Sequence, residues 1–193
     1  IGPPEVGEVL LQVAALDPGP EAITLLHGLA GREMTEPEAL QVVAWWQPQL
    51  AWITAAEQTA LLGFTGPTPD PGDKRAVLGD EFVPTLVAPA LNSTKDHARD
   101  RVWNARQLSE QFPALGELLR LGELDPYRVR LITDVLSTLI TPAQVAQVQE
   151  AILPVAATLS PVKLRKQLRK LARQVDPDWN TTMFVKARKN RRV

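Results

Sequence analysis

Lysine and arginine side chains are concentrated in one short segment near the C-terminal end of the chain. The stretch LSPVKLRKQLRKLARQVDP, residues 159–177, contains six of them and no acidic residue before Asp176. Such cations suit phosphate groups, because Lys and Arg neutralise the charges along a nucleic-acid backbone. We therefore predict that the following residues bind nucleic acid: Lys163, Arg165, Lys166, Arg169, Lys170 and Arg173.

The same segment has the pattern of an amphipathic helix. Ser160 can accept hydrogen bonds from the first helical turn, and Pro161 suits the first helical position, where its missing N–H is not needed. One apolar stripe recurs at helical spacing, and it consists of Leu164, Leu168, Leu171 and Val175. We expect this stripe to be buried and the cations to face outward.

A second set of cations lies in EFVPTLVAPALNSTKDHARDRVWNARQL, residues 81–108. An apolar helix ends near Leu91, Asn92 and Ser93 can form a turn, and another helix starts at Thr94. This spacing is typical of a helix-turn-helix hairpin, whose second helix would point outward toward DNA. Inward positions would be Ala98, Val102 and Ala105, and the outward face would carry Lys95, Arg99 and Arg106 around Trp103.

Two features of this hairpin favour a solvated surface over a DNA-reading one. Pro84 and Pro89 are expected to interrupt its first helix, since proline lacks the backbone donor of a helix interior. Asp96 and Asp100 place negative charge where a phosphate group would lie. The sequence leaves both interpretations open.

Residues that could catalyse a reaction are scarce. His27 and His97 are the only histidines, and neither has acidic residues at metal-ligand spacing. The chain contains no glycine-rich phosphate loop, no local signature of a serine hydrolase and no H-E-x-x-H motif. We expect no active site, metal site or cofactor within these residues.

The distribution of charge supports a polyanion-binding end. The net charge of the 193 residues is −1, but residues 160–193 hold eleven bases and two acids, a formal +9. The preceding residues hold ten bases and twenty acids, a formal −10. Such asymmetry indicates nucleic-acid binding, with Lys186 and Arg188 extending the basic surface, or pairing of the basic end with the acidic body.

The elements that would position these residues are helices throughout. No segment alternates at the period of a strand, so we predict an all-α protein, a compact multi-helix domain over residues 1–178. A turn-rich connector lies at residues 65–79, and residues 179–193 form a basic extension. Capping residues followed by proline predict three successive helix starts, at Asp125, Thr141 and Ser160. A long helix from Thr35 contains Trp45, Trp46 and Trp52, which we assign to the core, and Pro48 is expected to kink it.

No membrane role is expected. No apolar run approaches the roughly 18 residues of a membrane span, and the narrow stripe of residues 160–175 lacks the Trp and Phe typical of interfacial helices. The chain has no Cys, which excludes disulfides and is compatible with the cytoplasm. Because it begins with Ile1, we expect it to be part of a longer protein.

Several segments together resemble the actinobacterial domain of unknown function 222, also called the 13E12 repeat family. The resemblance covers roughly residues 35–193. It is carried by VVAWWQPQLAWITAAEQTALL, VAPALNSTKDHARDRVWNARQL, LLRLGELDPYRVRLI and LSPVKLRKQLRKLARQVDP. Pro89 and Ser93 depart from the family pattern, which weakens the helix-turn-helix interpretation.

The resemblance implies a helical domain upstream of an HNH endonuclease module in a protein of mobile or repeated elements. It implies that any divalent metal belongs to that downstream module, whose motif is absent here. Two hypotheses follow. The chain is a nucleic-acid-binding accessory domain, with duplex DNA as the expected partner, or a protein-interaction domain that forms a homo-oligomer. The sequence does not decide between DNA and RNA.

Overall fold

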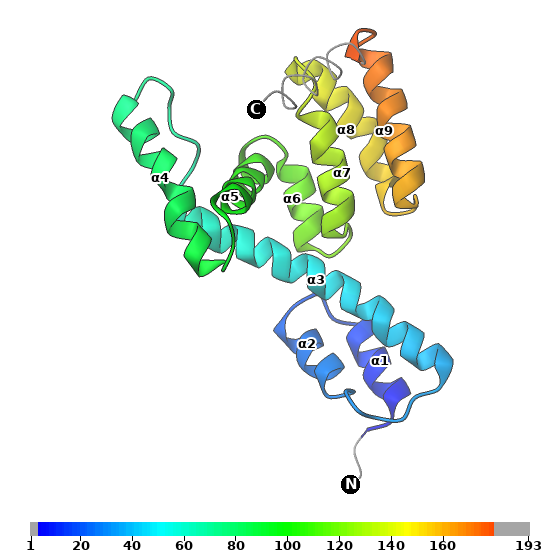
Figure 1. Ribbon diagram of the computed structural model, residues 1–193. Coiled ribbons are helices and arrows are strands. Elements are labelled where there is room, and N and C mark those ends of the chain that lie inside the picture. Colours follow the sequence, from blue (N-terminus) through cyan, green and yellow to red (C-terminus); the bar gives the residue numbers. More distant parts are fainter. Residues whose placement is uncertain (1–3, 180–193) are drawn as a thin grey trace. The chain divides into compact units, whose positions relative to one another are not determined.

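The computed structural model describes residues 4–179 of the chain. Within this range the protein forms nine α-helices and no β-strand (Figure 1), which confirms the all-α prediction. The helices are α1 (Val6–Ala14), α2 (Pro20–His27), α3 (Glu36–Thr65), α4 (Lys74–Ala90), α5 (Lys95–Glu110), α6 (Pro113–Arg120), α7 (Pro126–Leu136), α8 (Pro142–Ala156) and α9 (Pro161–Val175). They belong to two compact units, which meet in sequence between Glu123 and Leu124.

The predicted helix starts are confirmed by their backbone hydrogen bonds. The side chains of Asp125, Thr141 and Ser160 each accept from a backbone N–H in the first turn of α7, α8 and α9, respectively. Each of the three helices has proline in its first turn. At the start of α3, the Glu38 carboxylate accepts from the backbone N–H of Thr35 at 2.8 Å. Hydrogen bonds from Thr35, chiefly that of its hydroxyl, hold the pKa of Glu38 below its ordinary value.

The long helix α3 organises the N-terminal unit. Its first half packs against α1 and α2, where Trp45 and Trp46 lie partly buried against an apolar cluster that includes Val13 and Leu26. Its second half packs against α5 and α6. α3 continues as a helix through Pro48. Trp52 is also only half-buried, so these tryptophans line the core without being enclosed by it.

The backbone near the end of α6 passes so close to Pro48 that only glycine fits there. Gly122 has φ 72°, and a Cβ atom added there would lie 2.7 Å from the Cβ of Pro48. No other residue type fits this position, because both the backbone conformation and the space exclude a side chain. Next to it the buried Gln49 accepts a hydrogen bond from the backbone N–H of Gly19 at 2.8 Å. The loop before α2 and the end of α6 are thus both fixed against the middle of α3.

The predicted hairpin of residues 81–108 is present as α4 and α5. Asn92 adopts φ 46°, a left-handed conformation that Asn tolerates, and Thr94 caps α5 by accepting from the N–H of His97. The expected inward positions are buried: Ala98, Val102 and Ala105. The expected interruption by Pro84 and Pro89 is wrong, because α4 runs through both prolines and buries Pro84 with Val87 and Ala88. Apolar packing there outweighs the loss of one backbone hydrogen bond.

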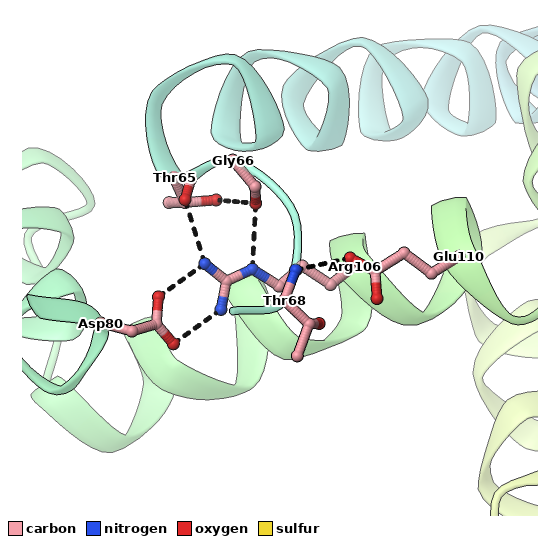
Figure 2. Close-up of polar contacts among 6 residues, drawn as sticks. All are labelled: Thr65, Gly66, Thr68, Asp80, Arg106 and Glu110. Carbon is pink, nitrogen blue, oxygen red and sulfur yellow. Dashed lines mark hydrogen bonds and ion pairs between the residues drawn. The ribbon is translucent and has the colours of Figure 1, made fainter. Parts of the chain in front are cut away.

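Arg106 connects three segments of the N-terminal unit (Figure 2). Its guanidinium pairs with both carboxylate oxygens of Asp80 on α4, at 2.6 and 2.8 Å. It also donates to the backbone carbonyls of Thr65 and Gly66 at the end of α3, both at 3.1 Å. Nearby, the Glu110 carboxylate accepts from the backbone N–H of Thr68 at 2.7 Å. We name this arrangement the Arg106 clamp, since it fixes the connector and α4 to α5.

The C-terminal unit consists of α7, α8 and α9, each of which contacts the other two. Its core includes Ile132, Leu136, Ile152, Leu164 and Leu168, none of which is accessible to solvent. Trp179 is buried, and its indole N–H donates to the Thr138 hydroxyl at 2.7 Å. The fold of this unit therefore extends at least to Trp179.

Arg128 fixes the start of α7 to the loop before α9. Its guanidinium pairs with Asp125 and donates twice to the carbonyl of Leu159, at 3.0 and 3.2 Å. Burial raises the pKa of Asp125, but the hydrogen bonds from Arg128 and from the backbone outweigh it, so the pKa lies below its ordinary value. The ion pair therefore persists at neutral pH.

Replacing Leu168 should test the role of the buried stripe. Leu168→Ala removes a side chain that is wholly enclosed, and we expect the free energy of unfolding of the C-terminal unit to fall by about 2 to 5 kcal/mol. Lys166→Ala, on the exposed side of the same helix, should change it by less than about 0.5 kcal/mol. Urea denaturation followed by circular dichroism measures both. Equal losses would show that α9 is not anchored by its apolar side.

The Arg106 clamp gives a second stability prediction. Arg106→Ala leaves Asp80 and two carbonyls without their donor, and we expect a loss of about 2 to 3 kcal/mol. This lies below the full cost of breaking a buried pair because Asp80 still reaches water. Arg99→Ala on the same helix removes the exposed pair with Asp96 and should cost less than about 0.5 kcal/mol. Thermal denaturation of both variants measures the difference, and similar melting temperatures would contradict a structural role for the clamp.

Candidate nucleic-acid interface

The six cations of α9 form one continuous exposed face. The buried side of the helix consists of Leu164, Leu168 and Ala172, which pack into the core of the C-terminal unit. With 15 residues, α9 is about 22 Å long. The side chains on its exposed face, which we call the α9 basic face, are Lys163, Arg165, Lys166, Arg169, Lys170 and Arg173. The predicted orientation of the stripe and of the cations is confirmed, although Leu171 and Val175 are only half-buried.

Charges on this face have few partners. Among residues 4–179, no carboxylate lies within salt-bridge distance of any of the six cations. Arg165 donates to the Tyr127 hydroxyl at 3.3 Å, and Arg173 donates to the backbone carbonyl of Arg169 at 3.0 Å. Elsewhere in the same range, five arginines pair with carboxylates: Arg99, Arg101, Arg106, Arg120 and Arg128. Arg32, Arg75 and Arg130 also lack a carboxylate partner in this range, so the α9 basic face is distinguished by having six such cations together on one side of a helix.

The edge of α7 adds two residues that the sequence analysis did not select. Tyr127 and Arg130 are exposed and lie one turn apart on α7. Asp134 follows one turn later, and the positive charges of both Arg130 and Arg165 act on it. The sequence contains a pattern that could have identified them: Tyr127 and Arg130 lie on the side of α7 opposite the apolar Val129 and Ile132. This pattern did not lead to a prediction, because the selection of binding residues relied on the density of cations, which is high only in α9.

Electrostatics at this edge are mixed. Desolvation raises the pKa of Asp134 above its ordinary value, and the charges of Arg130 and Arg165 oppose that rise. Asp134 thus brings a carboxyl group into the electrostatic range of an otherwise cationic surface. Anions are expected to prefer the side of α9 that carries Lys163, Lys166 and Lys170, away from this carboxylate.

Cations of the hairpin do not form the predicted shared face. Lys95 and Arg99 are exposed, and Arg99 pairs with Asp96 at 2.6 Å. The expectation that Arg106 lies on the same exposed face is wrong, because its side chain points into the Arg106 clamp and is 7% exposed. The physical reason is that Asp80 and two carbonyl groups at the end of α3 offer it partners in the interior.

A pocket of about 730 Å³ lies beside this hairpin. It is formed by the connector, α4 and α5, and its walls include Pro69, Val83, Val102 and Trp103. Arg99 lies at this pocket, whereas Asp80 and Arg106 in its lining are already bonded to each other. Its walls are mainly apolar, so it has little in common with a phosphate-binding groove.

Two of the predicted cations, Lys186 and Arg188, lie outside the described residues. Within residues 4–179, no group of three or more His, Asp or Glu side chains is placed to hold a metal ion. Both histidines, His27 and His97, are exposed. In the same range, no helix has the length and apolar character needed to cross a membrane.

The α9 basic face can therefore attract an extended polyanion, and its cations suit contacts to the phosphate backbone. Lys and Arg make contacts to phosphate oxygens, which fix position and orientation without carrying sequence information. A helix of about 22 Å can follow several phosphates of one strand. Two Gln side chains, of the kind that can recognise base edges, lie on α9 beside these cations: Gln167 is half-buried one turn after Lys163, and Gln174 is exposed one turn after Lys170.

Comparison with known proteins places the chain in a family without an assigned function. No curated protein and no solved structure matches the chain. One family model, described as a domain of unknown function (DUF222), matches residues 53–193, which include the C-terminal part of α3 and all of α4 to α9. Because this match covers most of the sequence, the chain belongs to the DUF222 family.

Proposed function

We propose that this chain is a nucleic-acid-binding accessory domain that holds duplex DNA through the α9 basic face. The observation that carries the proposal is the set of six exposed cations on one helix, with no carboxylate partner among residues 4–179. Ion pairs between these cations and acidic residues of the same chain would have supported the alternative hypothesis, in which the basic segment only neutralises the acidic body of the protein. Free cations at this density favour an external polyanion.

Binding of this kind is governed by the release of counterions from the DNA. Each phosphate that a cation neutralises lowers log K by roughly 0.9 per log unit of salt. A helix of this length, with four cations along its length and two beside them, should contact about three to five phosphates. The interaction is therefore weak at physiological salt and nearly independent of sequence. A domain of this kind increases the local concentration of DNA near another part of a protein.

The resemblance to domains upstream of HNH endonuclease modules suggests what that other part is. We propose that the parent protein is a cytoplasmic, actinobacterial nuclease of mobile or repeated elements, and that its metal ion is bound by the downstream module. The chain would position DNA for cleavage without taking part in it. In a parent protein of this kind, loss of the α9 cations should raise KM for DNA and leave kcat unchanged.

Charge reversal on α9 tests the proposal directly. The variant Lys166→Glu, Lys170→Glu and Arg173→Glu should lose most of its affinity for short duplexes of unrelated sequence, and its remaining affinity should depend less on KCl. Its fold should be kept, since all three side chains are exposed. Fluorescence anisotropy measures the binding, and circular dichroism measures the fold.

A matched control is available in the N-terminal unit. Reversal of Lys74, Arg75 and Arg120 changes the net charge by the same amount at exposed positions. If the α9 reversal and this control weaken binding equally, the effect is one of net charge and the proposed interface is wrong. Unchanged binding by the α9 reversal would show that its cations are only solvated. Duplex RNA and single-stranded DNA as competitors test the assignment to duplex DNA.

A substitution of Asp134 should act in the opposite direction. Asp134→Asn removes a negative charge that lies within the electrostatic range of Arg165 and Arg130, and we expect the affinity for duplex DNA to rise about two- to threefold at low salt. The gain should vanish at high salt, where such interactions are screened. Asp100→Asn on α5 serves as the comparison, measured by the same anisotropy titration. A gain at Asp100 without one at Asp134 would move the interface to the hairpin.

A further inference from the structure

The α9 basic face is wider than a single row of side chains. Successive residues of an α-helix are rotated by about 100°, so the buried Leu164, Leu168 and Ala172 occupy one sector of α9. By the same rotation, the six exposed cations span an arc of about 160° on the other side of the helix. Nearly half of the circumference of α9 is therefore open to a partner that surrounds it.

The major groove of B-form DNA has the dimensions to receive such a helix. The groove is about 12 Å wide, and an α-helix with its side chains is about 10 to 12 Å across. The minor groove is too narrow, at about 6 Å. Because α7 and α8 pack against α9 on its buried side, they leave the cationic side exposed. The part of α9 that would enter the groove is thus not covered by its own unit.

We propose that α9 lies in the major groove of duplex DNA, with the cations at the two edges of its arc on the two phosphate backbones and the central cations over the base edges. This assignment rests on the proposed function, because it names the groove that the same surface occupies. Helical rotation places Arg165 at one edge of the arc and Lys163 and Lys170 at the other. The centre of the arc carries Lys166 and Arg173.

The neighbouring helix α7 extends the Arg165 edge. The Arg165 guanidinium donates to the Tyr127 hydroxyl at 3.3 Å, and Tyr127 is 52% exposed. A hydroxyl that accepts this bond keeps its own proton, which it can donate to a phosphate oxygen. Arg130 adds a positive charge one turn along α7, and Asp134 opposes it after a further turn. We therefore expect both edges to hold a backbone, with the Lys163 edge binding more strongly.

The centre of the arc presents hydrogen-bond donors to the floor of the groove. Arg173 donates to the carbonyl of Arg169 through its Nε alone, which leaves its two terminal amino groups available. Lys and Arg have no acceptor atoms, and the major-groove edge of guanine offers two acceptors, N7 and O6. Val162 lies in the same central part, is 80% exposed and can contact a thymine methyl group. Most duplexes contain both bases, so these contacts add only a slight sequence preference.

The same dimensions favour duplex DNA over other nucleic acids. The major groove of A-form RNA is deep and narrow, so a helix cannot enter it as it enters B-form DNA. Surfaces that bind single strands use aromatic side chains on which unpaired bases stack, and α9 carries none. The width and composition of the α9 basic face therefore both point to a B-form duplex.

Neutral groups placed in one groove at a time test the assignment. Glucosylated 5-hydroxymethylcytosine fills the major groove, and N2-benzylguanine fills the minor groove, where the guanine amino group lies. The full chain is titrated with a short duplex that carries either group throughout, and fluorescence anisotropy gives the dissociation constant. We expect it to rise about tenfold with the major-groove group and less than about twofold with the minor-groove group. Equal effects, or a larger effect of the minor-groove group, would overturn the proposal.

A duplex with 7-deazaguanine tests which cations face the bases, because this base lacks the N7 acceptor but keeps its charge and size. The unmodified chain should bind the ordinary duplex about threefold more tightly than the 7-deazaguanine duplex. Replacing Lys166 and Arg173 together by Ala should bring the two affinities together. The matched control replaces Lys163 and Arg165 by Ala, which removes the same side-chain types from the edges. It should weaken binding to both duplexes and keep the difference between them.

Two results with 7-deazaguanine would contradict this orientation of α9. One is equal affinity of the unmodified chain for the two duplexes. The other is a difference that the edge variant loses and the central variant keeps. Failure of the proposed function looks different, since the chain would then not bind the ordinary duplex, or the α9 charge reversal would leave binding unchanged. Binding that depends on α9 but ignores the major-groove group would contradict only the assignment of the groove.

Discussion

Burial of the apolar side of α9 is the constraint on which the proposed binding surface depends. Leu164 and Leu168 are wholly enclosed by α7 and α8, and each such side chain stabilises the fold by about 1.5 to 3 kcal/mol. Exposed charges contribute far less to stability. The orientation of the helix is therefore set by its leucines, and the six cations face solvent as a consequence. They are free to serve binding because the fold does not need them.

Two groups of arginines in the described part of the chain differ in their surroundings. Arg106 and Arg128 join segments distant in sequence, and each satisfies its guanidinium with a carboxylate and with backbone carbonyls. Arg165 and Arg169 on α9 have no carboxylate partner. A guanidinium that holds the fold together is satisfied internally, whereas one that binds an anion must remain available. Internal bonding therefore identifies Arg106 and Arg128 as structural, whereas the grouping of six cations without carboxylate partners on one side of α9 identifies them as candidates for binding.

Features that depend on neighbouring residues could be predicted from the sequence, whereas features that depend on distant segments could not. The starts of α7, α8 and α9 were predictable because the cap and the proline lie next to the turn they stabilise. The inward positions of α5 followed from helical spacing alone. Arg106 was misplaced because its partners, Asp80 and the carbonyls of Thr65 and Gly66, are 26 to 41 residues away. Helical spacing places a side chain on a face of the helix, but it does not reveal which distant segment packs there.

The two sides of α9 respond to salt in opposite directions. Dissolved ions weaken DNA binding by the α9 basic face, because they screen its charges and reduce the free energy gained when counterions leave the DNA. Burial of the apolar side is strengthened by salts such as sulfate, which enhance the hydrophobic effect. Rising sulfate concentration should therefore release DNA while the C-terminal unit stays folded, so a loss of binding at high salt would reflect the electrostatic contacts and not unfolding.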